Sequence, residues 1–224
     1  MSTCALLFFG KCPTPGRVKT RLARSLGDES AAALAEAFLR DGARRYGAVP
    51  SCAPVLAADR PHEPFWKEAF PLPWRIEGQG DGDLGKRLAR AFSRELAGFR
   101  KVVAIGSDHP ALPTEALARF LAEENAIWPT RDGGYAAILL SRADAVPRLF
   151  KGIDWSTDRV LVQTMERASA DGIAMTRFPE TYDVDDESDL DLLARDLSSR
   201  DVRAPDFPSH TWKVLRSLSR MSLR

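Results

Sequence analysis

Short apolar runs alternate along the chain with longer stretches in which apolar residues recur at helical spacing. The apolar runs predict strands at residues 4–9, 54–58, 74–77, 101–106, 134–140 and 173–178. The helical spacing predicts helices at residues 28–46, 84–96, 156–168 and 188–197, with another that begins after Pro113. Strands that alternate with helices favour the α/β class, with a mostly parallel sheet covered by helices on both faces.

Four polar segments follow predicted strands and mark the place where a site is expected. They are GKCPTPGRVKTR after the strand at 4–9, GQGDGD after 74–77, GSDHP after 101–106, and YDVDD after 173–178. Ligands of open α/β sheets bind at the carboxyl ends of the strands. We therefore expect these four segments to meet at one edge of the sheet.

Composition places the chain among ordinary globular proteins. Its 224 residues suit one α/β domain, and 44% hydrophobic with 28% charged residues excludes a disordered, collagen-like or disulfide-scaffold protein. A formal net charge of +1 gives no overall attraction to nucleic acid or to an anionic membrane. The three cysteines lack metal-ligand spacing and no signal peptide is recognisable, so a cytoplasmic enzyme is expected.

Charge is segregated along the sequence although it is balanced overall. Residues 1–26 hold five basic side chains and no acid, whereas residues 183–191 hold six acids and no base. If the fold brings the two segments together, an anion and a metal ion would meet between them.

The loop after the first strand has the chemistry of a phosphate site. It carries four cations between a buried strand and a helix, namely Lys11, Arg17, Lys19 and Arg21. It is not a Walker A loop, because GRVKT lacks the Gly-Lys pair of that motif. A solvated basic turn is the alternative interpretation.

Gly80, Gly82 and Gly85 have the spacing GxGxxG, which is typical of dinucleotide-binding loops. Asp81 and Asp83 lie inside this loop and would repel a pyrophosphate, which argues against a nicotinamide cofactor. Gln79 and Asp83 instead carry groups suited to sugar hydroxyls or to the edge of a nucleobase.

Three aspartates are candidates for a metal site. Asp108 ends the most apolar strand, where a carboxylate would bind a hard divalent cation, and capping of the next helix is the alternative. Asp183 and Asp185 lie two residues apart, so in an extended segment they point to the same side and can share one cation. The DGGY segment at 132–135 is equally typical of a hairpin turn, and no nucleophilic triad is visible.

Taken together, these motifs resemble a known family. FGKCPTPGRVKTRL is similar to the FAKxPxPGxVKTRL signature of bacterial glycosyltransferase A (GT-A) superfamily proteins, described as selenodomain-associated or arsenosugar-biosynthesis glycosyltransferases. GDLGKRL, IGSDHPALP, DGGYAAILL, GIDWSTDRVL and YDVDDESDL follow in the family's order, so the resemblance covers residues 5–197. It implies the GT-A fold, a three-layer α/β/α sandwich that is also used by nucleotidyltransferases such as the molybdenum cofactor guanylyltransferase.

The resemblance also implies roles for single residues. By position, Lys11, Arg17, Lys19 and Arg21 match the phosphate loop, and Asp108 matches the GT-A metal site, which Asp185 joins. On the matching DGGY and GIDWSTDRVL segments we assign Asp132 as the catalytic residue, and we assign acceptor binding to Tyr135, Trp155, Ser156 and Thr157. The chain departs from the family at Trp128 and Arg131, and at His109, which replaces a small residue.

The expected activity is that of a metal-dependent glycosyltransferase with a nucleotide-activated sugar donor and Mg²⁺ or Mn²⁺ as cofactor. A nucleotidyltransferase that moves a nucleoside monophosphate from a triphosphate to a small phosphorylated or hydroxyl acceptor stays open, as does a catalytically inactive nucleotide-binding protein. The expected partners are a nucleotide sugar or nucleoside triphosphate and a small-molecule acceptor. No nucleic acid and no stable membrane anchor are expected, and a homodimer stays open.

The C-terminal segment forms a basic amphipathic unit of its own. We expect a transferase domain over residues 1–200 and, within residues 201–224, a helix whose apolar stripe is Trp212, Leu215, Leu218 and Met221. Lys213, Arg216 and Arg220 lie off that stripe. Packing on the same domain is the favoured interpretation, with a dimer contact or a membrane-surface anchor as alternatives.

Overall fold

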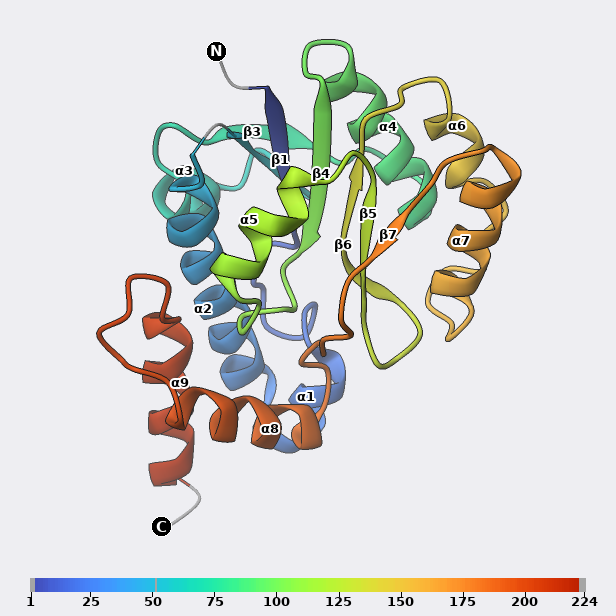
Figure 1. Cartoon of the computed structure of the whole chain (residues 1–224). Helices are drawn as coiled ribbons and strands as arrows, with labels where there is room; N and C mark the ends of the chain where they lie inside the picture. The colour runs from blue at the N-terminus through green and yellow to red at the C-terminus, as the bar shows by residue number, and fades with distance from the viewer. Residues whose placement is uncertain (1–2, 51, 222–224) are drawn as a thin grey trace.

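A computed structural model describes residues 3–50 and 52–221 (Figure 1). Within these ranges one sheet of seven strands runs through the molecule in the order β3-β2-β1-β4-β6-β5-β7. The strands are β1 (Cys4–Gly10), β2 (Cys52–Ala58), β3 (Arg75–Gly78), β4 (Lys101–Gly106), β5 (Ala126–Pro129), β6 (Tyr135–Leu140) and β7 (Thr176–Arg177). Strands β1 to β4 are parallel, β6 is antiparallel to both of its neighbours, and β7 is parallel to β5. The predicted α/β class with a mostly parallel sheet is confirmed.

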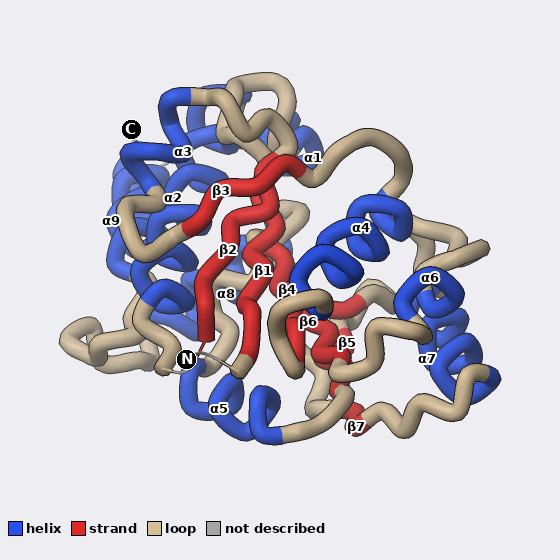
Figure 2. The backbone as a smooth tube through the Cα atoms, turned by 90° about the horizontal axis from the view of Figure 1, so that it is seen from above, coloured by secondary structure: helices blue, strands red, loops and turns tan. Residues whose placement is uncertain are grey.

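Helices cover the sheet on both faces, as the view from above shows (Figure 2). Helices α2, α3 and α5 pack on one face, and α4, α6 and α7 pack on the other. The helices are α1 (Thr20–Leu26), α2 (Asp28–Gly47), α3 (Pro64–Ala69), α4 (Leu84–Leu96), α5 (Thr114–Ala122), α6 (Val146–Leu149), α7 (Val160–Ala170), α8 (Glu187–Ser198) and α9 (Ser209–Met221). The molecule is therefore built of three layers, α/β/α.

Successive side chains of β1 point to opposite faces of the sheet, so this one strand contributes to two hydrophobic clusters. Leu6 and Phe8 pack into the cluster under α2 and α3, whereas Ala5 and Leu7 pack into the cluster under α4 and α6. Gly42 on α2 lies directly over Phe8, where any Cβ would collide with the ring. This close approach fixes α2 on the sheet, next to the loop that follows β1.

Several predicted elements differ from the structure in their extent. The strand expected over 173–178 is reduced to β7. The backbone N–H of Ile173 is not available to the sheet, because it donates to the carbonyl of Ala168 at the end of α7. The helix expected from residue 156 begins at Val160, since Ser156 has a positive φ of 66° that a helix does not accommodate. Strand β5 and the short helices α1, α3 and α6 are absent from the predicted set.

Helix α9 packs against α2 and α8 and joins a cluster that includes Leu34, Phe38 and Leu215. The buried carboxylate of Asp41 on α2 accepts hydrogen bonds from the first backbone N–H groups of α9. The side chains of residues 219–221, with Arg220 and Met221 of the predicted helix pattern, and residues 222–224 lie outside the described part. The boundary proposed near residue 200 stays a prediction.

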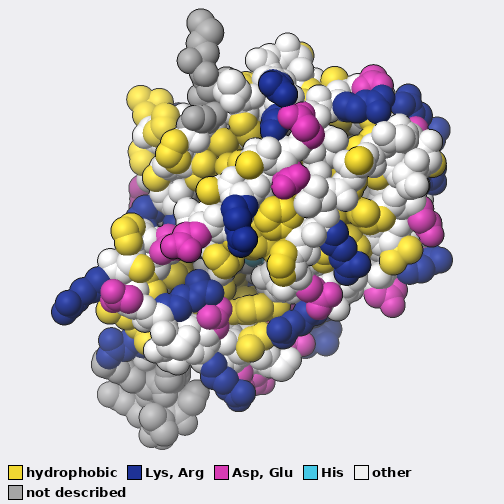
Figure 3. All heavy atoms as spheres, viewed as in Figure 1, with side chains coloured by type: hydrophobic (Ala, Val, Ile, Leu, Met, Phe, Trp, Pro, Cys, Tyr) yellow, Lys and Arg dark blue, Asp and Glu magenta, His cyan; other side chains and the backbone are white. Residues whose placement is uncertain are grey.

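The described surface matches the balanced charge of the chain. Figure 3 shows basic and acidic side chains interspersed over one face of the molecule. Among the helices in the described ranges, none combines the length and apolar character needed to span a bilayer.

Candidate active site

The loops at one edge of the sheet surround a cavity of about 1010 Å³. Strands β1, β3 and β4 end at this edge, and the antiparallel strand β6 begins there. Every site residue predicted from the sequence lines this cavity, namely Lys11, Arg17, Lys19, Arg21, Gln79, Asp83, Asp108, Asp132, Tyr135, Trp155, Ser156, Thr157, Asp183 and Asp185. The fold thus brings together segments that are up to about 170 residues apart in the sequence, because parallel strands place their carboxyl ends at one edge.

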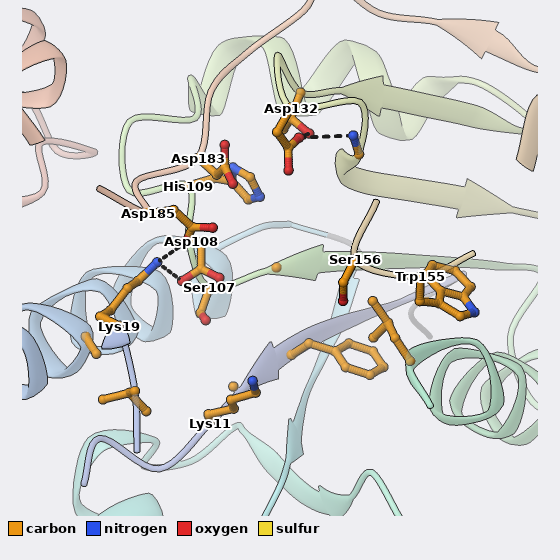
Figure 4. A pocket seen from close by; sticks show the side chains of 18 of the residues that line it. Lys11, Lys19, Ser107, Asp108, His109, Asp132, Trp155, Ser156, Asp183 and Asp185 are labelled. Carbon is orange, nitrogen blue, oxygen red and sulfur yellow. Dashed lines mark hydrogen bonds and ion pairs between the residues drawn. The ribbon is translucent and has the colours of Figure 1, made fainter. Parts of the chain in front are cut away.

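Lys19 has the most constrained position of the predicted phosphate-binding cations. It precedes α1 in the left-handed conformation, with φ 46°, and its side chain is only 6% exposed. The ammonium forms an ion pair with Asp108, lies 3.2 Å from Oδ1 of Asp185, and donates to the carbonyl of Val184 at 2.7 Å (Figure 4). Its three donors therefore have three protein acceptors.

Charge pairing outweighs burial within this cluster. Burial by itself would raise the pKa of Asp108, but the Lys19 ammonium holds the pKa of that carboxyl below its ordinary value. Burial would likewise lower the pKa of Lys19, and Asp108 and Asp185 together raise it above the ordinary value. Asp108 and Lys19 are thus both held in the ionised state near neutral pH.

The other cations of the first loop have a different environment. Within the described ranges, the side chains of Lys11 and Arg17 have no hydrogen bond or ion pair, and both are exposed. The charge of Lys11 nevertheless contributes to lowering the pKa of Asp108. Arg21 is 72% exposed and lies 3.8 Å from Asp185. Lys11 and Arg17 are therefore free to meet an anion without breaking an existing contact.

Asp132 and Asp183 add two further carboxyl groups to the cavity wall. Burial, together with the charges of Asp132 and Asp185, raises the pKa of Asp183 to about 6. Oδ1 of Asp132 accepts hydrogen bonds from Oγ1 of Thr130 at 2.6 Å and from the backbone N–H of Gly134 at 3.0 Å. This part of the cavity has an excess of negative charge.

Gln79 and Asp83 have structural contacts as well as a place on the cavity wall. The buried amide of Gln79 donates to the carbonyl groups of Gly10 and Ala57 and so joins the ends of β1 and β2. Asp83 caps α4 by accepting from the backbone N–H of Lys86 at 2.8 Å. Their predicted contacts to a nucleotide stay a prediction.

The residues assigned to acceptor binding bring two aromatic and two hydroxyl side chains to the cavity wall. Tyr135 and Trp155 pack against the cluster of α4, α6 and α7, and burial raises the pKa of Tyr135. Gly133 has φ 85°, and a Cβ there would clash with the carbonyl of Asp158. This contact locks the DGGY turn against the loop that carries Ser156 and Thr157, so DGGY is a turn as well as a part of the cavity wall.

His109 was not among the predicted site residues, although it lines the cavity and is buried. Its Nδ1 lies 3.1 Å from the carbonyl of Tyr182, and because a carbonyl only accepts, Nδ1 carries the proton. Burial lowers the pKa of His109, against the opposing influence of Asp108. The one sequence signal was its replacement of a small residue in GSDHP. Leu84, Arg87 and Thr130 also line the cavity without a prior signal.

Comparison with known proteins places this geometry in a family. Residues 43–157 match the family described as "uncharacterized protein conserved in bacteria (DUF2064)". The chain belongs to the DUF2064 family. A protein from Desulfovibrio desulfuricans G20, provisionally described as a nucleotide-diphospho-sugar transferase, has a structure similar to this DUF2064 protein with a TM-score of 0.88. The two are 30% identical in sequence over 99% of this chain and 98% of that chain.

More distant structures share the fold with this DUF2064 protein. A cytidylyltransferase from Leptospira borgpetersenii is 12% identical, with a TM-score of 0.58 over 100% of this chain and 96% of that one. The 4-diphosphocytidyl-2C-methyl-D-erythritol synthase from Anaerococcus prevotii is 11% identical, with a TM-score of 0.55 over 89% and 99%. None of the curated proteins matches the sequence. The fold is that of nucleotide-diphospho-sugar transferases and nucleotidyltransferases, as the sequence motifs led us to expect.

The donor set of the DUF2064 cavity suits a hard divalent cation. Asp108 and Asp185 supply carboxylate oxygens that already converge on one cation, the Lys19 ammonium. Asp183 adds a carboxyl group in a region of excess negative charge. In residues 3–50 and 52–221, no group of three or more His, Cys, Asp or Glu side chains is arranged to hold a metal. The carboxylates therefore fit Mg²⁺ or Mn²⁺ only as part of a larger ligand set.

Proposed function

We propose that this protein transfers a sugar from a nucleotide diphosphate donor to a small hydroxyl acceptor. One observation carries the proposal: Lys11 and Arg17, two cations without a partner in the described part of the chain, line the same cavity as a cluster of carboxylates. Its volume of about 1010 Å³ lies at the upper end of the range for ligand pockets, which leaves room for a donor together with an acceptor. The name of the D. desulfuricans relative supports the same class of donor.

The donor's diphosphate would lie against the first loop. Lys11 and Arg17 would bind the phosphate oxygens by charge-assisted hydrogen bonds, while the loop that carries Gln79 and Asp83 would contact the nucleoside. Asp108 and Asp185, with Asp183 beside them, would hold Mg²⁺ or Mn²⁺, which when bound supplies positive charge against the leaving diphosphate.

The acceptor would enter from the side of the DGGY turn. Tyr135 and Trp155 offer apolar surface to it, and Ser156 and Thr157 offer polar groups. Asp132 would take the proton of the acceptor hydroxyl on Oδ2, because Oδ1 already accepts two hydrogen bonds. A bond forms between the acceptor oxygen and the sugar C1 as the C1–O bond to the diphosphate breaks, and the nucleoside diphosphate leaves.

The motif order further supports placement in the selenodomain-associated or arsenosugar-biosynthesis group of GT-A glycosyltransferases. Nucleotidyl transfer is the second candidate, because the same cations and carboxylates would also support attack on the α-phosphate of a nucleoside triphosphate. A cytidylyltransferase shares the fold. A protein that binds nucleotides without turnover is the third.

Product analysis separates these candidates. The protein is incubated with a panel of nucleotide sugars and nucleoside triphosphates, with Mg²⁺ or Mn²⁺ and a mixture of small hydroxyl and phosphorylated acceptors. A nucleoside diphosphate among the products supports sugar transfer, and inorganic pyrophosphate supports nucleotidyl transfer. Asp132→Asn is the matched variant, since it keeps the hydrogen bonds of the turn and loses the base. Binding without turnover would leave the third candidate, and no binding of any nucleotide would refute all three.

A further inference from the structure

Lys19 occupies the position between the two carboxylates that a metal ion would need. Its ammonium contacts Asp108 and Asp185 at once, as the dashed lines in Figure 4 show. The third donor is satisfied by the carbonyl of Val184, the residue that precedes Asp185. A phosphate-binding lysine would instead keep donors available for its ligand, as the exposed Lys11 does.

We propose that Lys19 is a built-in counter-ion that excludes a divalent metal from Asp108 and Asp185 until a nucleotide diphosphate binds. This inference rests on the proposed function, because it explains how the same cavity would take up metal and nucleotide together. Lys19 then changes partners, from the two carboxylates to the phosphate oxygens.

The charges of the cluster explain why the two events are linked. Asp108 and Asp185 with Lys19 carry a formal net charge of −1, from two carboxylates and one ammonium. A divalent cation added next to the enclosed ammonium would repel it, and this repulsion is strong because solvent screens buried charges poorly. A diphosphate anion offers the displaced ammonium new acceptors and balances the added positive charge.

The backbone and the surroundings hold Lys19 in this arrangement. Its left-handed φ of 46° fixes where the side chain leaves α1, and the ammonium lies 5.6 Å from the centre of the Phe38 ring. Phe38 itself belongs to the buried cluster shared with α8 and α9. The lysine is thus positioned by packing and is more than a mobile surface charge.

Binding of Mn²⁺ alone tests the proposal without any nucleotide. Calorimetry and the electron paramagnetic resonance signal of free Mn²⁺ are measured for the wild type and for Lys19→Met, which keeps the length of the side chain and loses its charge. We expect the variant to bind Mn²⁺ at least about tenfold more tightly than the wild type, because a competing buried charge is gone. Lys67→Met, at an exposed lysine on α3 outside the cavity, is the control and should leave Mn²⁺ affinity within about twofold.

Further variants identify where the metal binds. Lys19→Met/Asp185→Asn should lose the gained affinity, and Lys19→Arg should keep Mn²⁺ out. Thermal unfolding shows whether each variant is folded, and Lys19→Gln, a neutral side chain that still donates hydrogen bonds, replaces the methionine variant if that one is not. In the wild type, UDP and GDP are then added to test whether either raises Mn²⁺ affinity beyond the binding of Mn²⁺ by the nucleotide itself.

Two results would overturn the proposal. One is wild-type affinity for Mn²⁺ alone that equals the affinity of the uncharged variants Lys19→Met and Lys19→Gln, and the other is a gain that survives loss of Asp185. A gain in Mn²⁺ affinity without any response to UDP or GDP would uphold the role of Lys19 as counter-ion and refute its release by these diphosphates, whereas failure of the proposed function appears as an absence of transfer products in the product analysis. The two failures are therefore distinguishable.

Discussion

Replacement of Lys11 by alanine tests whether the first loop binds a diphosphate. Lys11 directly follows β1, lines the cavity and is exposed, and within the described residues its side chain contacts no hydrogen-bond or ion-pair partner. The substitution leaves no buried group unpaired. We therefore expect the free energy of unfolding to change by less than about 0.5 kcal/mol.

The expected loss of affinity follows from the charge and the exposure of this side chain. A hydrogen bond to a charged group contributes about 1.5 to 3 kcal/mol, and solvent screening at an exposed site favours the lower end of that range. A loss of about 1.5 kcal/mol corresponds to roughly tenfold weaker binding of a nucleoside diphosphate. The affinity of the corresponding nucleoside should not change, because it has no phosphate for Lys11 to contact.

Calorimetric titration with a nucleoside and with its diphosphate, at low and at high salt, measures this difference. Lys67→Ala, an exposed lysine on α3 outside the cavity, is the matched control. The loss should shrink at high salt. The absence of a loss at low salt would show that the loop is only a solvated basic turn, and equal losses for nucleoside and diphosphate would point to a folding defect.

Three other substitutions test the scaffold around the cavity. Asp41→Ala should lower the free energy of unfolding by about 2 kcal/mol in urea titration, because α9 loses the buried carboxylate that accepts from its first N–H groups. Gly133→Ala should lower the melting temperature much more than Gly172→Ala, since both have positive φ but only Gly133 meets backbone, that of Asp158. Asp183→Asn should become more stable than the wild type as pH rises from about 4 to about 6 in metal-free buffer, because a pKa raised to about 6 means that the native carboxyl binds its proton more firmly than the unfolded one. Urea titrations across that pH range measure the difference, and parallel curves would refute it.

Local sequence chemistry was sufficient to find most of the charged residues that line the cavity. The cations of GKCPTPGRVKTR and the acids of GSDHP and YDVDD follow buried strands, and a parallel sheet places such segments at one edge. His109 escaped prediction because a single buried histidine has no distinctive spacing. Its tautomer depends on the carbonyl of Tyr182, which lies 73 residues away in the sequence.

The predicted boundaries of strands and helices were wrong where tertiary contacts compete with the local hydrophobic pattern. The apolar run at 173–178 predicts a full strand, but Ile173 is used to end α7 and the remainder pairs with β5 alone at the edge. Strand β5 is a four-residue apolar segment that ends in proline, and such a short run does not distinguish strand from helix. Its identity comes from pairing with β6 and β7.

The sequence by itself determined the α/β class, the alternation that gives β1 two buried faces, and which charged residues gather at the cavity. Hydrophobic period and strand-end position are local properties, so they can be read without the fold. Only the tertiary structure decided the partners within the cavity. Lys19 was expected to bind phosphate, yet its ammonium is enclosed by Asp108 and Asp185, because α1 and the segment before α8 meet only after folding. Charge pairing depends on distance in space, and for residues 166 positions apart that distance is set by how the sheet and helices pack.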